Sequence, residues 1–189
     1  SGHKIGAAKG VGALIIRDRK VVEAMIHGGG QQFGLRPGTE NVAGAVALGR
    51  AATLAAAEQA AHHAELTALR DAFTAGLVAA VPDAVVHGNG GTCAPHIVNV
   101  GFPGADSEAL LMHLDLAGVA ASGGSACNTG AVEPSHVLTA LGVPRDLALG
   151  SVRFSFGHGT TRAEVDRVLA LLPGVVAKVR QLAAVLGRA

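Results

Sequence analysis

The pattern of apolar and polar residues predicts one long helix and several shorter ones. Ala, Leu and Val dominate from 42 to about 80 with few breaking residues, which favours a long helix that breaks near His62-His63 and ends before Pro82. Further helices are expected from Asp106 or Ser107 to Leu116, from Pro134 to about Gly142, and from the capping-box sequence Thr161-Arg162-Ala163-Glu164 through Leu172, with a last helix after Pro173 to Leu186.

Short β-rich runs lie between these helices. Residues 151–156 alternate polar and apolar side chains, as a half-buried strand does. The runs 10–16 and 20–26 flank Asp18-Arg19, which predicts a hairpin or an edge pair. Strands alternating with helices give an α/β or α+β fold class, and the helical region near 60–65 is the best boundary, so the domains are set at 1–62 and 63–189. Other short strands are expected at 84–87, 97–100 and 118–121.

Composition indicates a packed globular protein and argues against two classes of partner. Of the 189 residues, 49% are hydrophobic and 15% are charged, and the formal net charge is +1. A chain with this charge and without Trp or Tyr gives no general case for binding nucleic acid or an anionic membrane. No uninterrupted apolar run reaches the length of a membrane-spanning helix. We therefore expect neither a nucleic-acid nor a membrane partner.

The cysteines indicate the cellular compartment of the protein, and the first residues indicate whether the chain is a fragment. The two cysteines, Cys93 and Cys127, form no CxxC pair, which fits free thiols in a reducing cytosol and predicts a cytoplasmic protein. Cys93 and His96 match no standard zinc-finger spacing, so no metal site is predicted. The chain opens on Ser1-Gly2-His3-Lys4 without an initiator Met or a targeting segment, and we expect a fragment cut within a domain.

Two N-terminal segments carry groups suited to an aldehyde and a phosphate. Lys4 lies beside the polar side chains of Ser1 and His3, and a lysine in a desolvated site can form a Schiff base with an aldehyde. The glycine-rich segment 27–41 contains Arg36 and Thr39 and leads into a helix N-terminus, where backbone amides favour an anion. Taken singly, Lys4 is more simply a surface lysine and segment 27–41 a surface loop.

Two C-terminal segments carry a thiol and a guanidinium. Cys127 lies in a run of Gly, Ser, Asn and Thr from 122 to 130, which favours an exposed loop and a reactive thiolate over a buried structural cysteine. Arg153 lies in an apolar strand, so it needs an anionic partner. That partner is either a substrate carboxylate or a structural ion pair, and this segment alone does not separate the two.

Together these four segments, in this order, resemble cysteine desulfurases of the NifS/IscS type, which have the class V aminotransferase fold. Ser1-Gly2-His3-Lys4 is similar to the family's S-x-H-K motif, and 28–41 to its glycine-rich loop. Ser125-Ala126-Cys127 is similar to the S-G-S-A-C branch, and Val152-Arg153-Phe154-Ser155 to the substrate-arginine strand. The resemblance implies the C-terminal part of the pyridoxal-phosphate-dependent transferase fold, namely the end of the large domain followed by the small α+β domain.

The resemblance also implies a role for each matching residue. Lys4 would hold pyridoxal 5'-phosphate and move the α-proton of the substrate, with Ser1, Gly2 and His3 binding the cofactor beside it. Thr39 would reach the phosphate bound by the other subunit, which implies a homodimer with shared active sites. Arg153 would bind the carboxylate of L-cysteine. Cys127 would accept the sulfur as a persulfide and pass it to an acceptor such as an iron–sulfur scaffold protein.

Other readings stay open. The family's remaining cofactor groups, including the aspartate at the pyridine nitrogen, lie upstream of the S-x-H-K lysine, so we expect this chain to be nearly inactive alone. Gln32-Phe33 replaces the family's commoner Glu-Arg or Glu-Gly pair. Another class V enzyme, such as an aminotransferase or a selenocysteine lyase, shares the fold and the lysine. The alternative outside enzymes is a truncated module that only dimerises or binds assembly partners.

Overall fold

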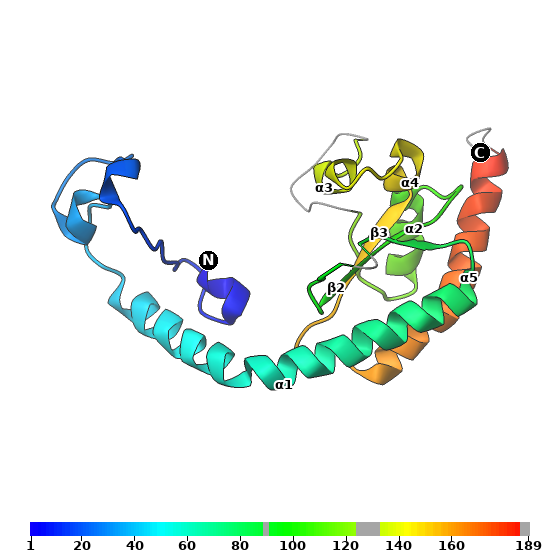
Figure 1. Cartoon of the computed structure of the whole chain (residues 1–189), viewed down its shortest axis with the longest axis horizontal. Helices are drawn as coiled ribbons and strands as arrows, with labels where there is room; N and C mark the ends of the chain where they lie inside the picture. Colours follow the sequence, from blue (N-terminus) through cyan, green and yellow to red (C-terminus); the bar gives the residue numbers. More distant parts are fainter. Residues whose placement is uncertain (89–90, 124–132, 186–189) are drawn as a thin grey trace. The chain divides into compact units, whose positions relative to one another are not determined.

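A computed structural model describes residues 1–88, 91–123 and 133–185 (Figure 1). The chain divides into two compact units, Ser1–His62 and His63–Ala189. The first unit ends at His62, which is also the last residue of the first domain predicted from the sequence. The assignment of the two parts to a large and a small domain stays a prediction.

The first unit contains short 3-10 helices followed by the start of a long α-helix. The elements are η1 (Gly2–Ile5), η2 (Arg19–Val21), η3 (Gln31–Gly34) and the first half of α1 (Val42–Ala80). The hairpin expected from 10–16 and 20–26 is wrong, since neither run forms a strand in the described structure. Ile15 and Met25 are 92% and 95% exposed, so no apolar layer supports a pair of strands that would be marginal in isolation.

Helix α1 is continuous through the position where a break was expected. Neither His62 nor His63 is a strong helix breaker, and the Thr67 hydroxyl donates to the His63 carbonyl at 2.7 Å, a bond compatible with an intact helix. The helix ends at Ala80, before Pro82, as the sequence predicts.

The second unit is built on a three-stranded antiparallel sheet in the order β1-β2-β3. The strands are β1 (Val85–Val86), β2 (Ile97–Gly101) and β3 (Ser151–Ser155), all within or beside expected runs. Asn99 faces Arg153 in the register of β2 and β3. Because side chains alternate along a strand, the buried apolar residues share one face and Asn99 and Arg153 share the other. The core face carries Val98, Val100, Val152 and Phe154.

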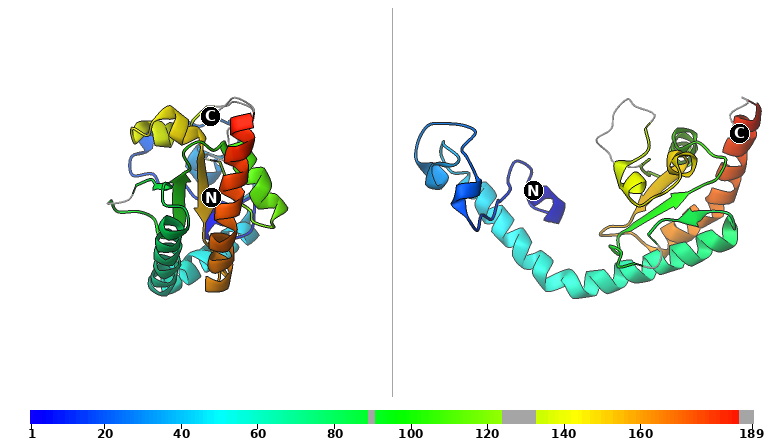
Figure 2. Two further views of the ribbon diagram at one scale, coloured as in Figure 1. Left: turned by 90° about the vertical axis from the view of Figure 1, so that its right-hand side faces the viewer. Right: turned by 45° about the horizontal axis from the view of Figure 1, so that its top comes forward.

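Three helices supply the apolar side chains that cover the core face. They are the C-terminal half of α1, α2 (Ser107–Leu116) and α5 (Arg162–Val185), and the first part of α5 lies beside the C-terminal half of α1 in Figures 1 and 2. The ring of Phe73 lies 4.9 Å from that of Phe154 and 5.7 Å from that of Phe156, measured between centroids. A Cβ at Gly76 would overlap the side chain of Leu169, so glycine permits α1 and α5 to approach closely there.

The ends of α2 and α5 follow the expected capping chemistry. The Asp106 carboxylate accepts from the Ala109 amide at 3.0 Å. The Thr161 amide donates to Glu164 Oε2 at 2.7 Å, and the Glu164 amide donates to Thr161 Oγ1 at 3.3 Å, which confirms the capping box.

Two expectations in this unit are wrong, and one helix was not expected. Pro173 lies inside α5 without ending it, because Leu172 and Val176 are both buried and core packing on either side offsets the lost hydrogen bond. Residues 118–121 form no strand, and Ser122 alone bridges to Arg153. Helix α4 (Arg145–Leu149) was not expected, whereas α3 (His136–Ala140) lies within the predicted range.

Helix α5 is also long and apolar enough, by length and composition, to cross a membrane. Charged residues interrupt the apolar run of α5, so a search for uninterrupted apolar runs in the sequence does not detect this helix as a candidate span. Four of its residues, Val165, Leu172, Val176 and Val179, are buried in the core of the second unit.

Candidate active site

The N-terminal motif forms a single 3-10 turn that presents Lys4. The Gly2 amide donates to the Val11 carbonyl at 2.8 Å, and a Cβ at Gly2 would lie 3.0 Å from that oxygen, so glycine suits the close approach. Gly6 ends the turn with a φ of 81°, which glycine adopts without strain. Ser1 Oγ lies 3.0 Å from His3 Nδ1. The Lys4 side chain is exposed and makes no hydrogen bond or ion pair with any described residue, so its amine is available.

Two arginines bind carbonyl groups of the glycine-rich segment, Arg36 from within it and Arg19 from η2. Arg36 Nη1 donates to the carbonyls of Pro37, Gly38 and Thr39 at 2.9–3.2 Å. These hydrogen bonds stabilise the turn that contains the arginine. Arg19 Nη2 donates to the Phe33 carbonyl at 2.6 Å, and its guanidinium lies 5.1 Å from the Phe33 ring centroid.

Two residues of this segment adopt an uncommon backbone conformation. Gln32 and Phe33 have φ values of 49° and 60°, in the left-handed region. They are the pair that departs from the family pattern. Thr39 is exposed and comes three residues before the start of α1. Its hydroxyl is therefore accessible from solvent.

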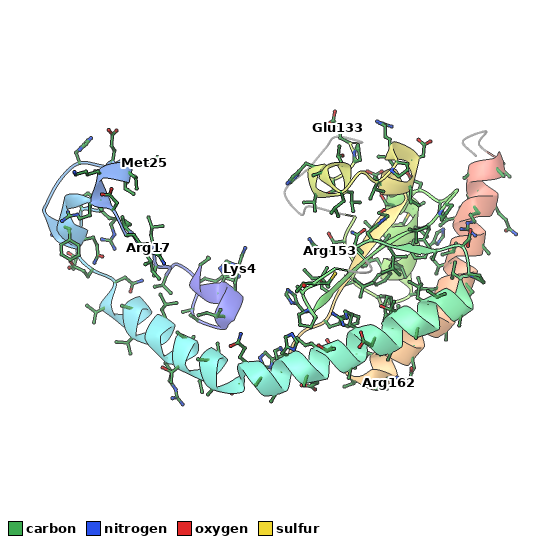
Figure 3. All side chains as sticks on the ribbon, in the orientation of Figure 1. Lys4, Arg17, Met25, Glu133, Arg153 and Arg162 are labelled. Carbon is green, nitrogen blue, oxygen red and sulfur yellow. The ribbon has the colours of Figure 1, made fainter. Side chains whose placement is uncertain are left out.

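Arg153 lies on β3, on the face of the sheet opposite the core (Figure 3). Its side chain makes no hydrogen bond or ion pair with another described residue, and its buried Nε has no acceptor there. A guanidinium on an apolar strand needs an anionic partner, and a carboxylate is the anion whose planar geometry matches its terminal nitrogens. Among the described residues, the structural ion pair considered from the sequence is absent, which favours an anionic ligand.

The chain beside Arg153 leads into the segment that holds Cys127. The Arg153 amide donates to the Ser122 carbonyl at 2.6 Å, and the Ser122 amide donates to the Arg153 carbonyl at 3.1 Å. This backbone bridge places the segment's start against β3. Cys127 itself lies outside the described residues. The other thiol, Cys93, is exposed and donates to the Gly88 carbonyl at 3.0 Å.

Sequence reasoning missed three polar residues on the same face as Arg153: His87, Asn99 and Ser151. His87 donates its amide to the Asn99 carbonyl at 2.9 Å, which extends the sheet by one residue beyond β1. Asn99 Oδ1 is buried and has no hydrogen-bond partner among the described residues. The available signal was Asn99 itself, a polar residue inside the apolar run 97–100.

His87 and Ser151 form a second polar pair across the sheet. The Ser151 hydroxyl donates its single hydrogen to the Leu147 carbonyl at 2.7 Å, so it can only accept from His87 Nε2, which lies 3.0 Å away. His87 Nε2 therefore carries a proton in this arrangement. Burial of the ring lowers the pKa of His87, which keeps it neutral near pH 7.

The predicted site residues are divided between the two units. Ser1, His3, Lys4 and Thr39 belong to the first unit, and Arg153 to the second. Across residues 1–88, 91–123 and 133–185, no group of three His, Cys, Asp or Glu side chains is arranged to hold a metal ion.

Comparison with known proteins identifies the family. The aminotransferase class-V family matches residues 1–168. The cysteine desulfurase of Gluconacetobacter diazotrophicus is 45% identical over 182 residues, which cover 96% of this chain and 46% of that protein. The cysteine desulfurase NifS of Azotobacter vinelandii is 42% identical over 181 residues, covering 96% of this chain and 45% of that protein.

Solved structures agree with this assignment. A NifS-like protein superposes with a TM-score of 0.78 at 33% identity, over 94% of this chain and 45% of that one. DndA from Streptomyces lividans superposes with a TM-score of 0.61 at 38% identity, over 82% of this chain and 44% of that one. The chain therefore spans about half the length of the relatives it matches. It belongs to the aminotransferase class-V family, and cysteine desulfurases of the NifS/IscS type are among its relatives.

Proposed function

We propose that this chain provides the C-terminal half of a pyridoxal-phosphate-dependent cysteine desulfurase, which converts L-cysteine to L-alanine and holds the sulfur on Cys127. The observation that carries the proposal is the guanidinium of Arg153, which makes no hydrogen bond or ion pair with another described residue and whose backbone is bridged to Ser122, the first residue of the Cys127 segment. This arrangement would hold the carboxylate of an amino acid near the chain that bears the thiol.

The functional groups on η1 and in the loop before α1 fit the cofactor. Lys4 offers a free amine for its aldehyde, and Ser1 and His3 offer a hydroxyl and an imidazole on the same turn. Gly2 allows the turn to close, and Thr39 offers an accessible hydroxyl for a phosphate, which the family resemblance assigns to the other subunit of a homodimer. When bound, pyridoxal phosphate would supply an electron sink that weakens the bonds at the substrate's α-carbon.

Arg153, Lys4 and Cys127 would each have a separate role in the reaction. Arg153 would grip the substrate carboxylate through two parallel hydrogen bonds. Lys4 would move the α-proton once its amine is released. The Cys127 thiolate would attack the substrate sulfur, forming an S–S bond as the C–S bond breaks. L-cysteine and the enzyme thiol would thereby give L-alanine and an enzyme persulfide, with the two thiol hydrogens shared between the products.

The destination of the sulfur follows from the chemistry of a persulfide. An outer sulfur held in an S–S bond can be passed to another thiolate by exchange. We propose an acceptor or iron–sulfur scaffold protein in a reducing, cytoplasmic environment.

A trapping experiment with the upstream half supplied tests the cofactor role. The chain is co-expressed with the N-terminal half of the Gluconacetobacter diazotrophicus enzyme, loaded with pyridoxal phosphate and reduced with borohydride. We expect one reduced cofactor adduct, on Lys4, and its loss in Lys4→Ala but not in the matched variant Lys9→Ala. An adduct on Lys9, or one that survives Lys4→Ala, would contradict the assignment.

A further inference from the structure

The polar face of the second unit carries two buried atoms of matching chemistry. Asn99 and Arg153 are directly opposed in the register of β2 and β3. Asn99 Oδ1 is an acceptor without a donor, and Arg153 Nε is a donor without an acceptor, among the described residues, so the two atoms are not bonded to each other in this structure. Directly opposed Cβ atoms in an antiparallel pair are about 4.5–5.5 Å apart, so the two groups are within the combined reach of their side chains.

The polar side chains on the β1 side of this pair are engaged with other groups. His87, the adjacent polar side chain on the β1 side, is engaged with Ser151, whose hydroxyl is in turn bound to the Leu147 carbonyl. The ring of His87 lies over Gly101, where a Cβ would be only 2.8 Å from its Nε2. The ring is therefore held toward Gly101, which lies two residues from Asn99 along β2.

We propose that Asn99 is the positioning residue for Arg153: rotation of the two opposed side chains brings the carboxamide oxygen to Nε, where it accepts a hydrogen bond and orients the guanidinium. The single Nε–H is then satisfied by the protein, and both terminal nitrogens remain for a carboxylate. This inference rests on the proposed function, because it assigns the substrate carboxylate to those nitrogens. It adds the residue that sets the direction from which the carboxylate is bound.

The pairing is tested first in the 189-residue chain, without any need for activity. The arginine side-chain Nε–H signals are recorded by NMR, and that of Arg153 is assigned from its loss in Arg153→Lys. We expect its hydrogen exchange to be about tenfold faster in Asn99→Ala than in the wild-type chain, because the acceptor is gone. Asn99→Asp keeps an acceptor oxygen and should keep slow exchange. Equal exchange in the wild type and Asn99→Ala would overturn the pairing.

Kinetics of the complemented enzyme then test the consequence. We expect Asn99→Ala to raise the KM for L-cysteine about tenfold with kcat changed less than about twofold, because carboxylate binding is weakened in ground and transition states alike. In an Arg153→Lys background, Asn99→Ala should have no further effect on KM, since the two residues act as a unit. Ser155→Ala, the exposed next position on the same face of β3, is the matched control and should leave KM unchanged.

The two tests separate the inference from the function on which it rests. If Arg153 exchange depends on Asn99 but the complemented enzyme makes no alanine from L-cysteine, the desulfurase proposal fails and the pairing stands. If alanine is made but Asn99→Ala lowers kcat alone, or its effects add to those of Arg153→Lys, the positioning role is overturned.

Discussion

Adding one methyl group at Gly101 should disrupt the polar face of the sheet. A Cβ there would lie 2.6 Å from Leu147 Cδ1 and 2.8 Å from His87 Nε2. Ordinary carbon contacts are about 3.5–4.0 Å, so both neighbours must withdraw by about 1 Å. Withdrawal of the ring would break the 3.0 Å contact between His87 and Ser151.

The cost of Gly101→Ala can be worked from these two effects. Overpacking a buried site costs about 1–3 kcal/mol. A lost hydrogen bond adds about 0.5–1.5 kcal/mol. We therefore expect the free energy of unfolding to fall by about 1.5–4.5 kcal/mol relative to a glycine-to-alanine change in open space. Gly157→Ala is that control, because a Cβ there meets no atom within 4 Å and its φ is not positive.

Urea unfolding followed by far-ultraviolet circular dichroism measures the difference, since the chain lacks Trp and Tyr as fluorescent probes. With a slope of about 2 kcal/mol per molar urea, the midpoint of Gly101→Ala should lie about 1–2 M below that of Gly157→Ala. Comparison with Gly157→Ala removes the gain that both variants share from a less flexible unfolded chain. Midpoints that agree would refute the close packing of His87 and Leu147 on Gly101.

Three other predictions test the core, the half-buried His87 and the capping box. Phe73→Ala should lower the free energy of unfolding by about 3–5 kcal/mol in the same assay, because the ring is 1% exposed and packs on Phe154; a loss below about 1 kcal/mol would contradict this. Because burial lowers the pKa of His87, the unfolded chain takes up that proton first, so stability is fully present above pH 6.5 and falls as the pH drops toward the folded pKa. His87→Gln should flatten this dependence, and an unchanged slope would argue against a buried ring. Hydrogen bonds from the Thr161 amide and hydroxyl lower the pKa of Glu164, so Thr161→Val should raise that pKa in an NMR titration; no rise would mean that the hydroxyl does not reach the carboxylate.

The sequence predicted those elements whose cause is local. Asp106 begins α2 and Thr161 begins α5 because their side chains satisfy free amides of the first turn. The strand β3 was predicted from its alternation, which matches one buried face, and β2 from a short apolar run bounded by Gly, Asn and Pro. Where tertiary packing decides, local reasoning failed: Pro173 stays helical between buried neighbours.

The same distinction applies to the site. Arg153 and Lys4 stood out because a charged residue in an apolar strand and a lysine in a familiar motif are visible in the sequence alone. The opposition of Asn99 and Arg153 depends on the register of two strands about fifty residues apart, which no local pattern reports. The left-handed backbone of Gln32 and Phe33 was equally invisible, because neither residue type favours that conformation.

The most direct test of the proposed function is the fate of the substrate sulfur. The chain, complemented by the upstream half and loaded with pyridoxal phosphate, is given L-cysteine labelled at sulfur, and persulfides are trapped and mapped by mass spectrometry. We expect the label on Cys127, its loss in Cys127→Ser, and its retention in Cys93→Ser, which removes the other thiol of the chain. Alanine formed with no label on Cys127, or label that persists in Cys127→Ser, would contradict the account.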